Sequence, residues 1–221
     1  MTTRAYIFDA YGTLFDVHAA IARYRDRAGP DADRISELWR TKQLEYSWTL
    51  TAMGRYENFE RLTERSLDFA LARFGRSDPA LRAALLDSYR KLDAYPDAKA
   101  ALGTLKQAGA VTGILSNGSP GMLQAAVDNA ALGGMLDHVL SVDALGFYKP
   151  RNEVYALVTD AASVRPEEIV FVSSNRWDIA GAANFGFKPV WVNRANLPDE
   201  YPDLKPVAVI NSLSALPSLK F

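Results

Sequence analysis

The chain opens with a short apolar run that ends in an acid. Residues 5–8, Ala-Tyr-Ile-Phe, are followed by Asp9 and by a bend that contains glycine, a pattern that predicts a short buried strand with a carboxylate at its carboxyl end. In open α/β sheets, ligands bind in the crevice beyond these strand ends. Asp9 is therefore a candidate site residue, although aspartate also closes strands and opens turns for structural reasons alone.

Residues 17 to 93 have a different character, with apolar positions at helical spacing and no convincing strand. The spacing predicts helices over residues 35–48, 67–74, 78–92 and, more weakly, 20–27. A purely helical block between the first strand and the rest of the chain is typical of an inserted cap domain.

From Tyr95 onward, helical and strand patterns alternate. Helices are predicted over residues 98–105, 119–132, 152–162 and 176–185, and strands over residues 111–115, 138–141, 168–172, 189–192 and 207–210. Such alternation indicates a parallel sheet covered on both faces, joined by right-handed crossovers. The predicted fold is α/β: a doubly wound parallel sheet from residues 1–15 and 94–221, interrupted by an all-helical cap of residues 16–93.

The composition excludes several functional classes. A formal charge of -1 over 221 residues gives no field that would recruit nucleic acid or an anionic membrane surface. The chain has no cysteine and two separated histidines, so thiolate chemistry, disulfides and a histidine-based metal site are not expected. No apolar run approaches membrane-spanning length, and the first residues do not resemble a signal peptide. We expect a cytoplasmic protein.

Polar residues follow several of the predicted strands, at what should be one edge of the sheet. Each has a structural explanation, because serine and asparagine cap helices, a loop lysine is usually solvated, and an acid in a first helical turn favours the helix dipole. Together they suggest a covalent, two-step displacement, in which an ionised carboxylate attacks beside an ammonium group and a second acid activates water. The residues are Asp9, Ser116, Asn117, Lys149, Ser173, Asn175 and Asp178.

The segments FDAYGTL, SNG, YKP and SSNRWD resemble, in order and spacing, the four motifs of the haloacid dehalogenase superfamily. The resemblance covers essentially the whole chain and implies a Rossmann-like core with a cap. Most members are magnesium-dependent phosphatases whose first motif holds two aspartates one residue apart. Here Tyr11 stands at the second position. Without that acid, metal binding and leaving-group protonation both lose support, and phosphoryl transfer depends strongly on the metal.

The form DAYGTLFD, together with LWRTKQLEYSW at residues 38–48, is instead similar to the L-2-haloacid dehalogenases. This resemblance implies hydrolysis of short (S)-2-haloalkanoic acids to (R)-2-hydroxyalkanoic acids through an aspartyl ester. It implies water as the second substrate, a halide product, no cofactor, no metal and no membrane or nucleic-acid partner. Related enzymes also suggest a homodimer.

The resemblance also implies roles for individual residues. Asp9 is the expected nucleophile, Asp178 and Lys149 the candidates for activating water, and Arg40 the expected halide acceptor. Ser173, Asn175 and Thr13 complete the catalytic set. The expected substrate-binding residues are Ser116, Asn117, Tyr155, Tyr11, Leu44, Phe59 and Trp177. Ordinary core packing is the alternative for Tyr155 and for the apolar members of this list.

Two rival functions stay open on the sequence alone. One is a magnesium-dependent phosphatase of the same fold, and the other is a non-catalytic protein that binds a small carboxylic acid. No pattern assigns a role to His18 beside the first motif, and the preferred halogen and chain length depend on a pocket volume that the sequence does not give.

Overall fold

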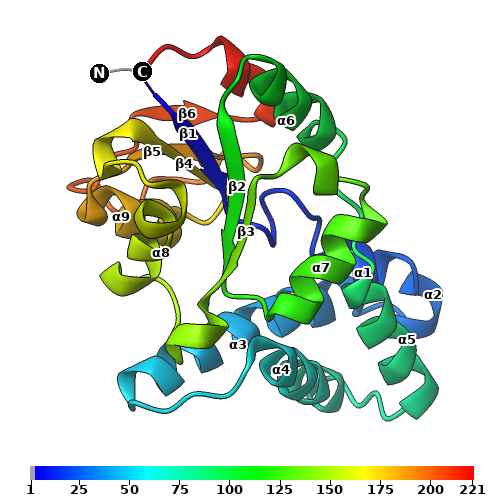
Figure 1. Ribbon diagram of the computed structural model, residues 1–221. Coiled ribbons are helices and arrows are strands. Elements are labelled where there is room, and N and C mark those ends of the chain that lie inside the picture. Colours follow the sequence, from blue (N-terminus) through cyan, green and yellow to red (C-terminus); the bar gives the residue numbers. More distant parts are fainter. Residues whose placement is uncertain (1–2) are drawn as a thin grey trace.

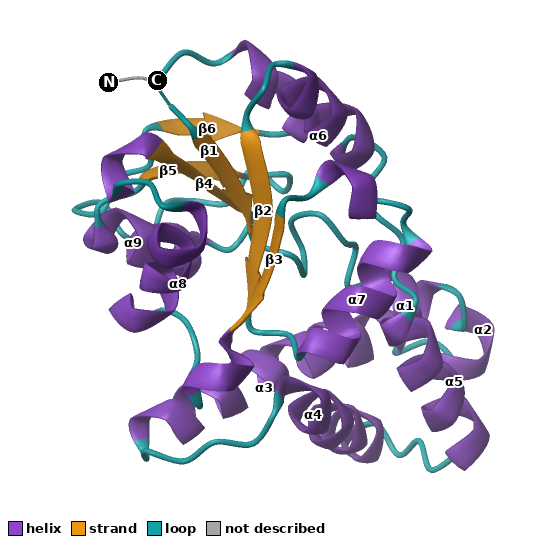
Figure 2. Cartoon of the chain, viewed as in Figure 1, coloured by secondary structure: helices purple, strands orange, loops and turns teal. Residues whose placement is uncertain are grey.

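A fully parallel six-stranded sheet forms the centre of the protein (Figure 2). The computed structural model describes residues 3–221, so residues 1 and 2 of the predicted core segment lie outside it. The strand order is β3-β2-β1-β4-β5-β6. The strands are β1 (Ala5–Phe8), β2 (Val111–Ser116), β3 (His138–Ser141), β4 (Ile169–Ser173), β5 (Lys188–Val192) and β6 (Ala208–Ile210).

Four helices cover the two faces of this sheet. They are α6 (Ala98–Gln107), α7 (Pro120–Asn129), α8 (Asn152–Ala162) and α9 (Arg176–Phe185). Figure 1 shows α8 and α9 on one face and α6 and α7 on the other. Because both faces are covered, the central strands are almost continuously apolar and buried, as β4 with its sequence IVFVS shows. The predicted doubly wound α/β core is confirmed.

The strand order reverses direction next to β1. From β1 the chain adds β2 and β3 on one side, then returns to add β4, β5 and β6 on the other. The carboxyl ends of β1 and β4 therefore flank the switch point where α/β folds form their binding crevice. Asp9 directly follows β1, and its backbone N–H donates to the carbonyl of Val172 in β4 at 2.9 Å.

The segment between β1 and α6 is helical. It contains α1 (Ala19–Ala22), α2 (Arg25–Ala28), α3 (Ala32–Ala52), α4 (Phe59–Arg73) and α5 (Pro79–Arg90). The two connections to the core run antiparallel, with the N–H of Asp16 donating to the carbonyl of Asp93 at 3.0 Å and that of Tyr95 to Leu14 at 2.8 Å. We propose residues 16–93 as the bounds of this helical cap, since the paired connections lie at both of its ends.

Helix α4 begins well before the stripe that predicts it. Asn58 caps the helix by accepting a hydrogen bond from the N–H of Arg61. Thr63 and Ser66 interrupt the apolar pattern, but both are buried. Their hydroxyl groups donate hydrogen bonds to the helix carbonyls of Phe59 and Leu62. The weaker prediction over residues 20–27 corresponds to two short helices, α1 and α2.

None of the helices within residues 3–221 has the length and apolarity needed to cross a lipid bilayer.

Candidate active site

The strand exits bring the predicted polar residues to one edge of the sheet. Asp9 follows β1, Ser116 ends β2 and is followed by Asn117, and Ser173 ends β4 shortly before Asp178 in the first turn of α9. Lys149 lies just before α8 and is 1% exposed. Hydrogen bonds join five of the predicted residues at this edge: Asp9, Asn117, Lys149, Asn175 and Asp178.

The Asp9 carboxylate is held by three donors. Its Oδ2 accepts hydrogen bonds from Thr13 Oγ1 at 3.1 Å and Asn175 Nδ2 at 2.9 Å, and its Oδ1 accepts one from Lys149 Nζ at 3.2 Å. Thr13 is itself fixed, because its Oγ1 accepts from the backbone N–H of Ser174 at 2.9 Å. These three donors hold the carboxylate in a single orientation.

Lys149 bridges two acids. Besides Asp9, its Nζ donates to Asp178 Oδ2 at 2.8 Å. Burial alone would lower the pKa of Lys149, but the negative charges of Asp178 and Asp9 outweigh burial and hold this pKa above its ordinary value. The lysine therefore supplies a permanent positive charge between the two carboxylates at neutral pH.

Asp178 is the most deeply buried acid of the site, with no exposed surface. Its Oδ1 accepts a hydrogen bond from the Tyr155 hydroxyl at 2.7 Å. Burial raises the pKa of Asp178 to about 6, despite the opposing effect of Lys149. Gly181 permits this arrangement, since a Cβ there would lie 2.3 Å from the Tyr155 hydroxyl oxygen. A carboxyl group with a pKa near neutrality is suited to accept a proton.

The donor set does not fit a magnesium ion. The Lys149 ammonium bridges Asp9 Oδ1 and Asp178 Oδ2, so a positive charge already lies between the two carboxylates that would have to share the ion. The backbone carbonyl of Tyr11 is also engaged, since Arg40 Nη2 donates to it at 3.1 Å. Magnesium requires several such oxygens in octahedral geometry. Within the described residues, no cluster of three or more acidic or histidine side chains offers an alternative.

A small cavity adjoins Asp9 beneath the cap. It is lined by Asp9, Tyr11, Arg40, Leu44, Phe59, Ser116, Asn117 and Trp177. The ring of Tyr11 stacks on Tyr89 and Phe59, with centroids 5.7 and 6.2 Å apart. Gly118 allows this ring to approach the backbone, because a Cβ at that position would lie 2.6 Å from Tyr11 Cε2. Where a phosphatase would hold its second acid, this site has an aromatic wall.

The sequence comparisons agree with this geometry. The haloacid dehalogenase-like hydrolase family matches residues 3–186. "(S)-2-haloacid dehalogenase 1" of Pseudomonas sp. (strain CBS-3) is 50% identical over 219 residues, which span 98% of this chain and 96% of the relative. The chain belongs to the L-2-haloacid dehalogenase family.

Solved structures of this family share the fold. A crystal structure described as a dehalogenase superposes with a TM-score of 0.97 at 47% identity, covering 98% of this chain and 97% of that one. The L-2-haloacid dehalogenase of Xanthobacter autotrophicus with chloropropionic acid covalently bound has a TM-score of 0.90 at 38% identity, with 99% and 98% coverage. Both contain the core and the cap, because nearly the whole of each chain superposes.

Three of the predicted residues of this dehalogenase-family site also hold its loops in place. The Ser116 hydroxyl accepts from the N–H of Gly118 at 3.1 Å, and the Ser173 hydroxyl from that of Asn175 at 3.1 Å. Asn117 Oδ1 accepts from the N–H of Lys149 at 3.1 Å. Ser173 thereby positions the amide that binds Asp9, and Asn117 ties the exit of β2 to the lysine segment.

Tyr155 lies beside Asp178 and is not among the residues lining the cavity around Asp9. Its side chain has no exposed surface, and burial raises its pKa well above the ordinary value. It therefore remains a neutral donor to Asp178. The geometry favours a role in holding that acid over the direct substrate contact that the sequence suggested.

A buried polar chain supports the aromatic wall from the cap, and the sequence did not indicate it. The Tyr89 hydroxyl donates to Gln43 Oε1 at 3.2 Å, and Gln43 Nε2 donates to Thr63 Oγ1 at 2.9 Å. Tyr89 follows Leu81 and Leu85 on the buried side of α5. A hydroxyl on an otherwise apolar stripe was the signal that could have identified it.

His18 lies at the connection between core and cap. Its Nδ1 shares a hydrogen bond of 2.8 Å with the Ser36 hydroxyl of α3. This contact joins the connection to the cap and does not reach the residues around Asp9.

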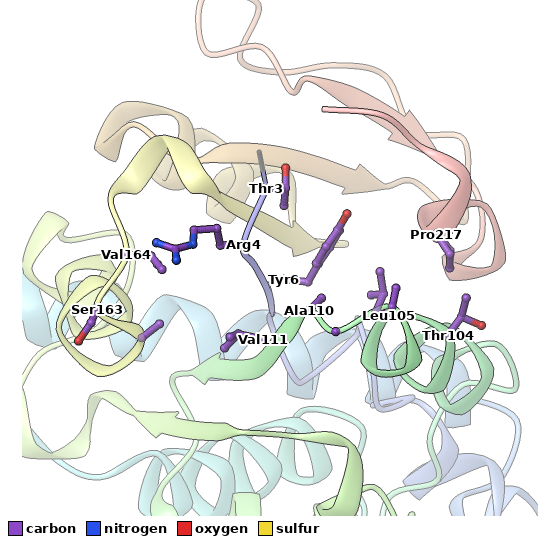
Figure 3. A pocket seen from close by; sticks show the side chains of 13 residues that line it. Thr3, Arg4, Tyr6, Thr104, Leu105, Ala110, Val111, Ser163, Val164 and Pro217 are labelled. Carbon is purple, nitrogen blue, oxygen red and sulfur yellow. The ribbon is translucent and has the colours of Figure 1, made fainter. Parts of the chain in front are cut away.

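A separate hollow of about 540 Å³ opens at the opposite edge of the sheet, beside the amino ends of β1 and β2. Arg4, Tyr6, Thr104, Val111 and Ser163 are among the residues that line it (Figure 3). It contains none of the residues predicted for the site. Its size alone therefore does not make it the catalytic centre.

Proposed function

We propose that the protein hydrolyses short (S)-2-haloalkanoic acids to (R)-2-hydroxyalkanoic acids. The observation that carries this proposal is the arrangement of Asp9, Lys149 and Asp178. The buried Lys149 ammonium binds both carboxylates, and the pKa of Asp178 is raised. The ring of Tyr11 lines the cavity beside Asp9. Relatives described as (S)-2-haloacid dehalogenases support it, as does the related enzyme that holds chloropropionic acid covalently.

The first step is attack by Asp9 on the halogen-bearing carbon. Oδ2 accepts two hydrogen bonds, whereas Oδ1 accepts one of 3.2 Å, so Oδ1 keeps the more available lone pair. A bond forms between Oδ1 and the α-carbon as the carbon–halogen bond breaks, and the halide leaves with the bonding electrons. The product of this step is an ester on Asp9, with the configuration at carbon inverted.

Ser116, Asn117 and Arg40 orient the substrate. Ser116 and Asn117 lie before the amino end of α7, where backbone N–H groups favour an anion such as the substrate carboxylate. Arg40 reaches from α3 of the cap to the Tyr11 carbonyl and lines the cavity, which supports its role as the group that receives the halide. The walls of Tyr11, Leu44, Phe59 and Trp177 exclude water, which strengthens these electrostatic contacts.

The second step is hydrolysis of the ester at its carbonyl carbon. Asp178 accepts a proton from water as the hydroxide oxygen bonds to Asp9 Cγ. The Cγ–Oδ1 bond then breaks, the leaving oxygen takes that proton from Asp178 to give the hydroxy acid, and the Asp9 carboxyl group loses its proton to solvent. Negative charge develops on Oδ2, where Thr13 and Asn175 already donate. The bond to the chiral carbon is untouched in this step, so the single inversion is retained.

Turnover should fall at acidic pH with an apparent pKa at or below about 6, because the ester removes the Asp9 charge that helps to raise the pKa of Asp178. Asp178 accepts a proton only when ionised, and its pKa is raised to about 6, so each unit below this value should cost up to about tenfold in rate. Lys149 stays charged across this range because its pKa is raised. The Tyr155 hydroxyl lowers the pKa of Asp178, so Tyr155→Phe should move the acidic limb to higher pH. A kcat profile from pH 4.5 to 8.5 for both proteins tests this, and a limb that stays in place in the variant would contradict it.

Halide release in the presence of a chelator separates the proposed function from a phosphatase. We expect chloride from (S)-2-chloropropionate and formation of (R)-lactate in excess EDTA, because the positive charge of the site is a lysine. A generic phosphate ester with magnesium should not be hydrolysed. The converse pattern would establish the phosphatase, and binding of 2-chloropropionate without any halide release would establish a carboxylate-binding protein.

We also propose the cytoplasm as the compartment and a homodimer as the assembly. The cysteine-free sequence fits a reducing compartment, and apolar side chains such as Phe69 and Met53 are exposed on the cap. Fractionation of cells and light scattering of the purified protein test these two proposals.

A further inference from the structure

A second hollow lies on the far side of Trp177 from the catalytic cavity. It has a volume of about 350 Å³ and is bordered by α3 of the cap through Trp48 and Ala52, and by the core through Lys149, Trp177 and Tyr201. The catalytic cavity measures about 10 Å³, which is the room of a single water molecule. The outer hollow is thus within the usual size range of small-molecule pockets, about 300–1,000 Å³.

Trp177 is the partition between the two spaces. It borders both, and its ring stands edge-on to Trp48 with the centroids 5.3 Å apart. Trp48 is 38% exposed and Trp177 is half-buried, so neither ring is packed on all sides. Lys149 also borders the hollow, although its Nζ lies 3.2 Å from the Asp9 carboxylate. Trp177 is therefore the side chain that the hollow shares with the cavity around Asp9.

The core side of the hollow is firmly built. Tyr201 belongs to the segment after β5, and Arg176 fixes that segment by donating from Nε to Asp199 at 2.7 Å and from Nη2 to the Leu204 carbonyl at 2.9 Å. The Arg176 guanidinium also lies 5.3 Å from the centre of the Tyr201 ring. Arg176 itself is buried, at 4% exposure. The position of Tyr201 is thus set by the fold.

We propose that this hollow is a subsite for the alkyl tail of longer 2-haloalkanoic acids. This inference rests on the proposed function and extends it from the reacting end of the substrate to its chain length. The lining is chiefly aromatic and aliphatic, and the ammonium of its one charged side chain, Lys149, is already bound to two carboxylates. A tail of three or more carbons passes Trp177 when that ring turns, and it then packs against Trp48, Ala52 and Tyr201.

Filling the hollow should reduce activity on long substrates selectively. Ala52 is exposed at the end of α3, so Ala52→Phe adds bulk inside the hollow without touching Asp9, Lys149 or Asp178. 2-Bromohexanoate has three more methylenes than 2-bromopropionate, and each buried methylene is worth about fourfold in binding. We expect kcat/KM for the (S)-hexanoate to fall at least about tenfold and at most about 60-fold in this variant. The value for (S)-2-bromopropionate should change less than about twofold.

Two further variants complete the test. Ala100→Phe, at an exposed alanine of the core helix α6, is the matched control and should leave both substrates unaffected. Trp177→Leu removes the indole ring between the two spaces. It should raise the ratio of kcat/KM for 2-bromohexanoate to kcat/KM for 2-bromopropionate, even if both values fall.

The outcomes distinguish this inference from the proposed function. Equal losses on both substrates in Ala52→Phe, or no turnover of 2-bromohexanoate by the unmodified protein while 2-bromopropionate is consumed, would overturn the alkyl subsite alone. Absence of halide release from every 2-haloacid would instead overturn the proposed function.

Discussion

Asp9→Asn should abolish halide release, with a loss of at least about 10⁴-fold in kcat. The amide is neutral and a poor nucleophile. Its NH₂ group would also face Lys149 or the donors Thr13 and Asn175, all of which now donate to the carboxylate. Single-turnover halide release from (S)-2-chloropropionate measures the loss.

The neighbouring acid of the first motif provides the matched control. Asp16 accepts a hydrogen bond from the His18 backbone at the connection to the cap and does not contact the Asp9 group. Asp16→Asn should therefore keep kcat within a few-fold of the unmodified protein. A comparable loss in both variants would show that charge in this region is needed for folding, and that Asp9 has no special part in the chemistry.

Heavy-oxygen water identifies the attacked atom. If Asp9 forms the ester, one turnover in labelled water leaves light oxygen in the hydroxy acid and heavy oxygen in the Asp9 carboxylate. Digestion and mass spectrometry of the peptide containing Asp9 locate the label. Heavy oxygen in the product of the first turnover would mean direct attack by water, and the covalent scheme would be wrong.

The fold followed from the sequence because local pattern and global topology agree. The apolar runs at residues 111–115 and 168–172 became β2 and β4 with shifts of a single residue, since strands buried on both faces leave an unbroken apolar signal. Helix α4 was the main exception. Thr63 and Ser66 are buried in that helix, because their hydroxyl groups donate hydrogen bonds to its backbone. A prediction based on apolar positions alone assigns such residues to the solvent-facing side.

The candidate site was predictable only in part. Its core half follows from topology, because parallel strands bring Asp9, Ser116 and Ser173, at their carboxyl ends, to one edge of the sheet. The cap half depends on how α3 packs over that edge, which no periodicity specifies. Arg40 came from family resemblance alone, and Tyr89, which supports the Tyr11 ring, was not identified.

The contacts that join the cap to the core could not be predicted from the sequence either. The Tyr56 hydroxyl of the cap donates to Asp143 Oδ1 of the core, and the N–H of Tyr148 donates to Thr51 Oγ1 at 3.1 Å. These pairs are 87 and 97 residues apart in the chain. Such long-range polar pairs leave no local pattern, although they help to hold Trp48 and Arg40 of α3 near the residues of the sheet edge.

Asp178→Asn should separate the two chemical steps. The attack by Asp9 does not use Asp178 as a base, whereas hydrolysis of the ester does, so the variant should carry out the first step and then stop. We expect kcat to fall by about 10²–10⁴-fold, the usual contribution of a general base. The asparagine oxygen can still accept from Lys149, which also keeps Asp9 as its partner, and the asparagine NH₂ group can donate to the Tyr155 hydroxyl oxygen. The residues that orient the substrate, Ser116, Asn117 and Arg40, should therefore keep their positions.

The trapped ester gives this prediction a direct readout. Rapid mixing with (S)-2-chloropropionate should release a burst of about one chloride per active site, and intact-mass analysis should show the added carboxyethyl group, mapped to Asp9 after digestion. Tyr155→Phe is the control, because it removes a hydrogen bond to Asp178 while the carboxylate base remains, and it should turn over without accumulating the ester. Neither burst nor adduct in Asp178→Asn would mean that this acid is required before the ester forms. Its raised pKa would then reflect burial beside Lys149, and the base for the second step would have to be sought elsewhere in the site.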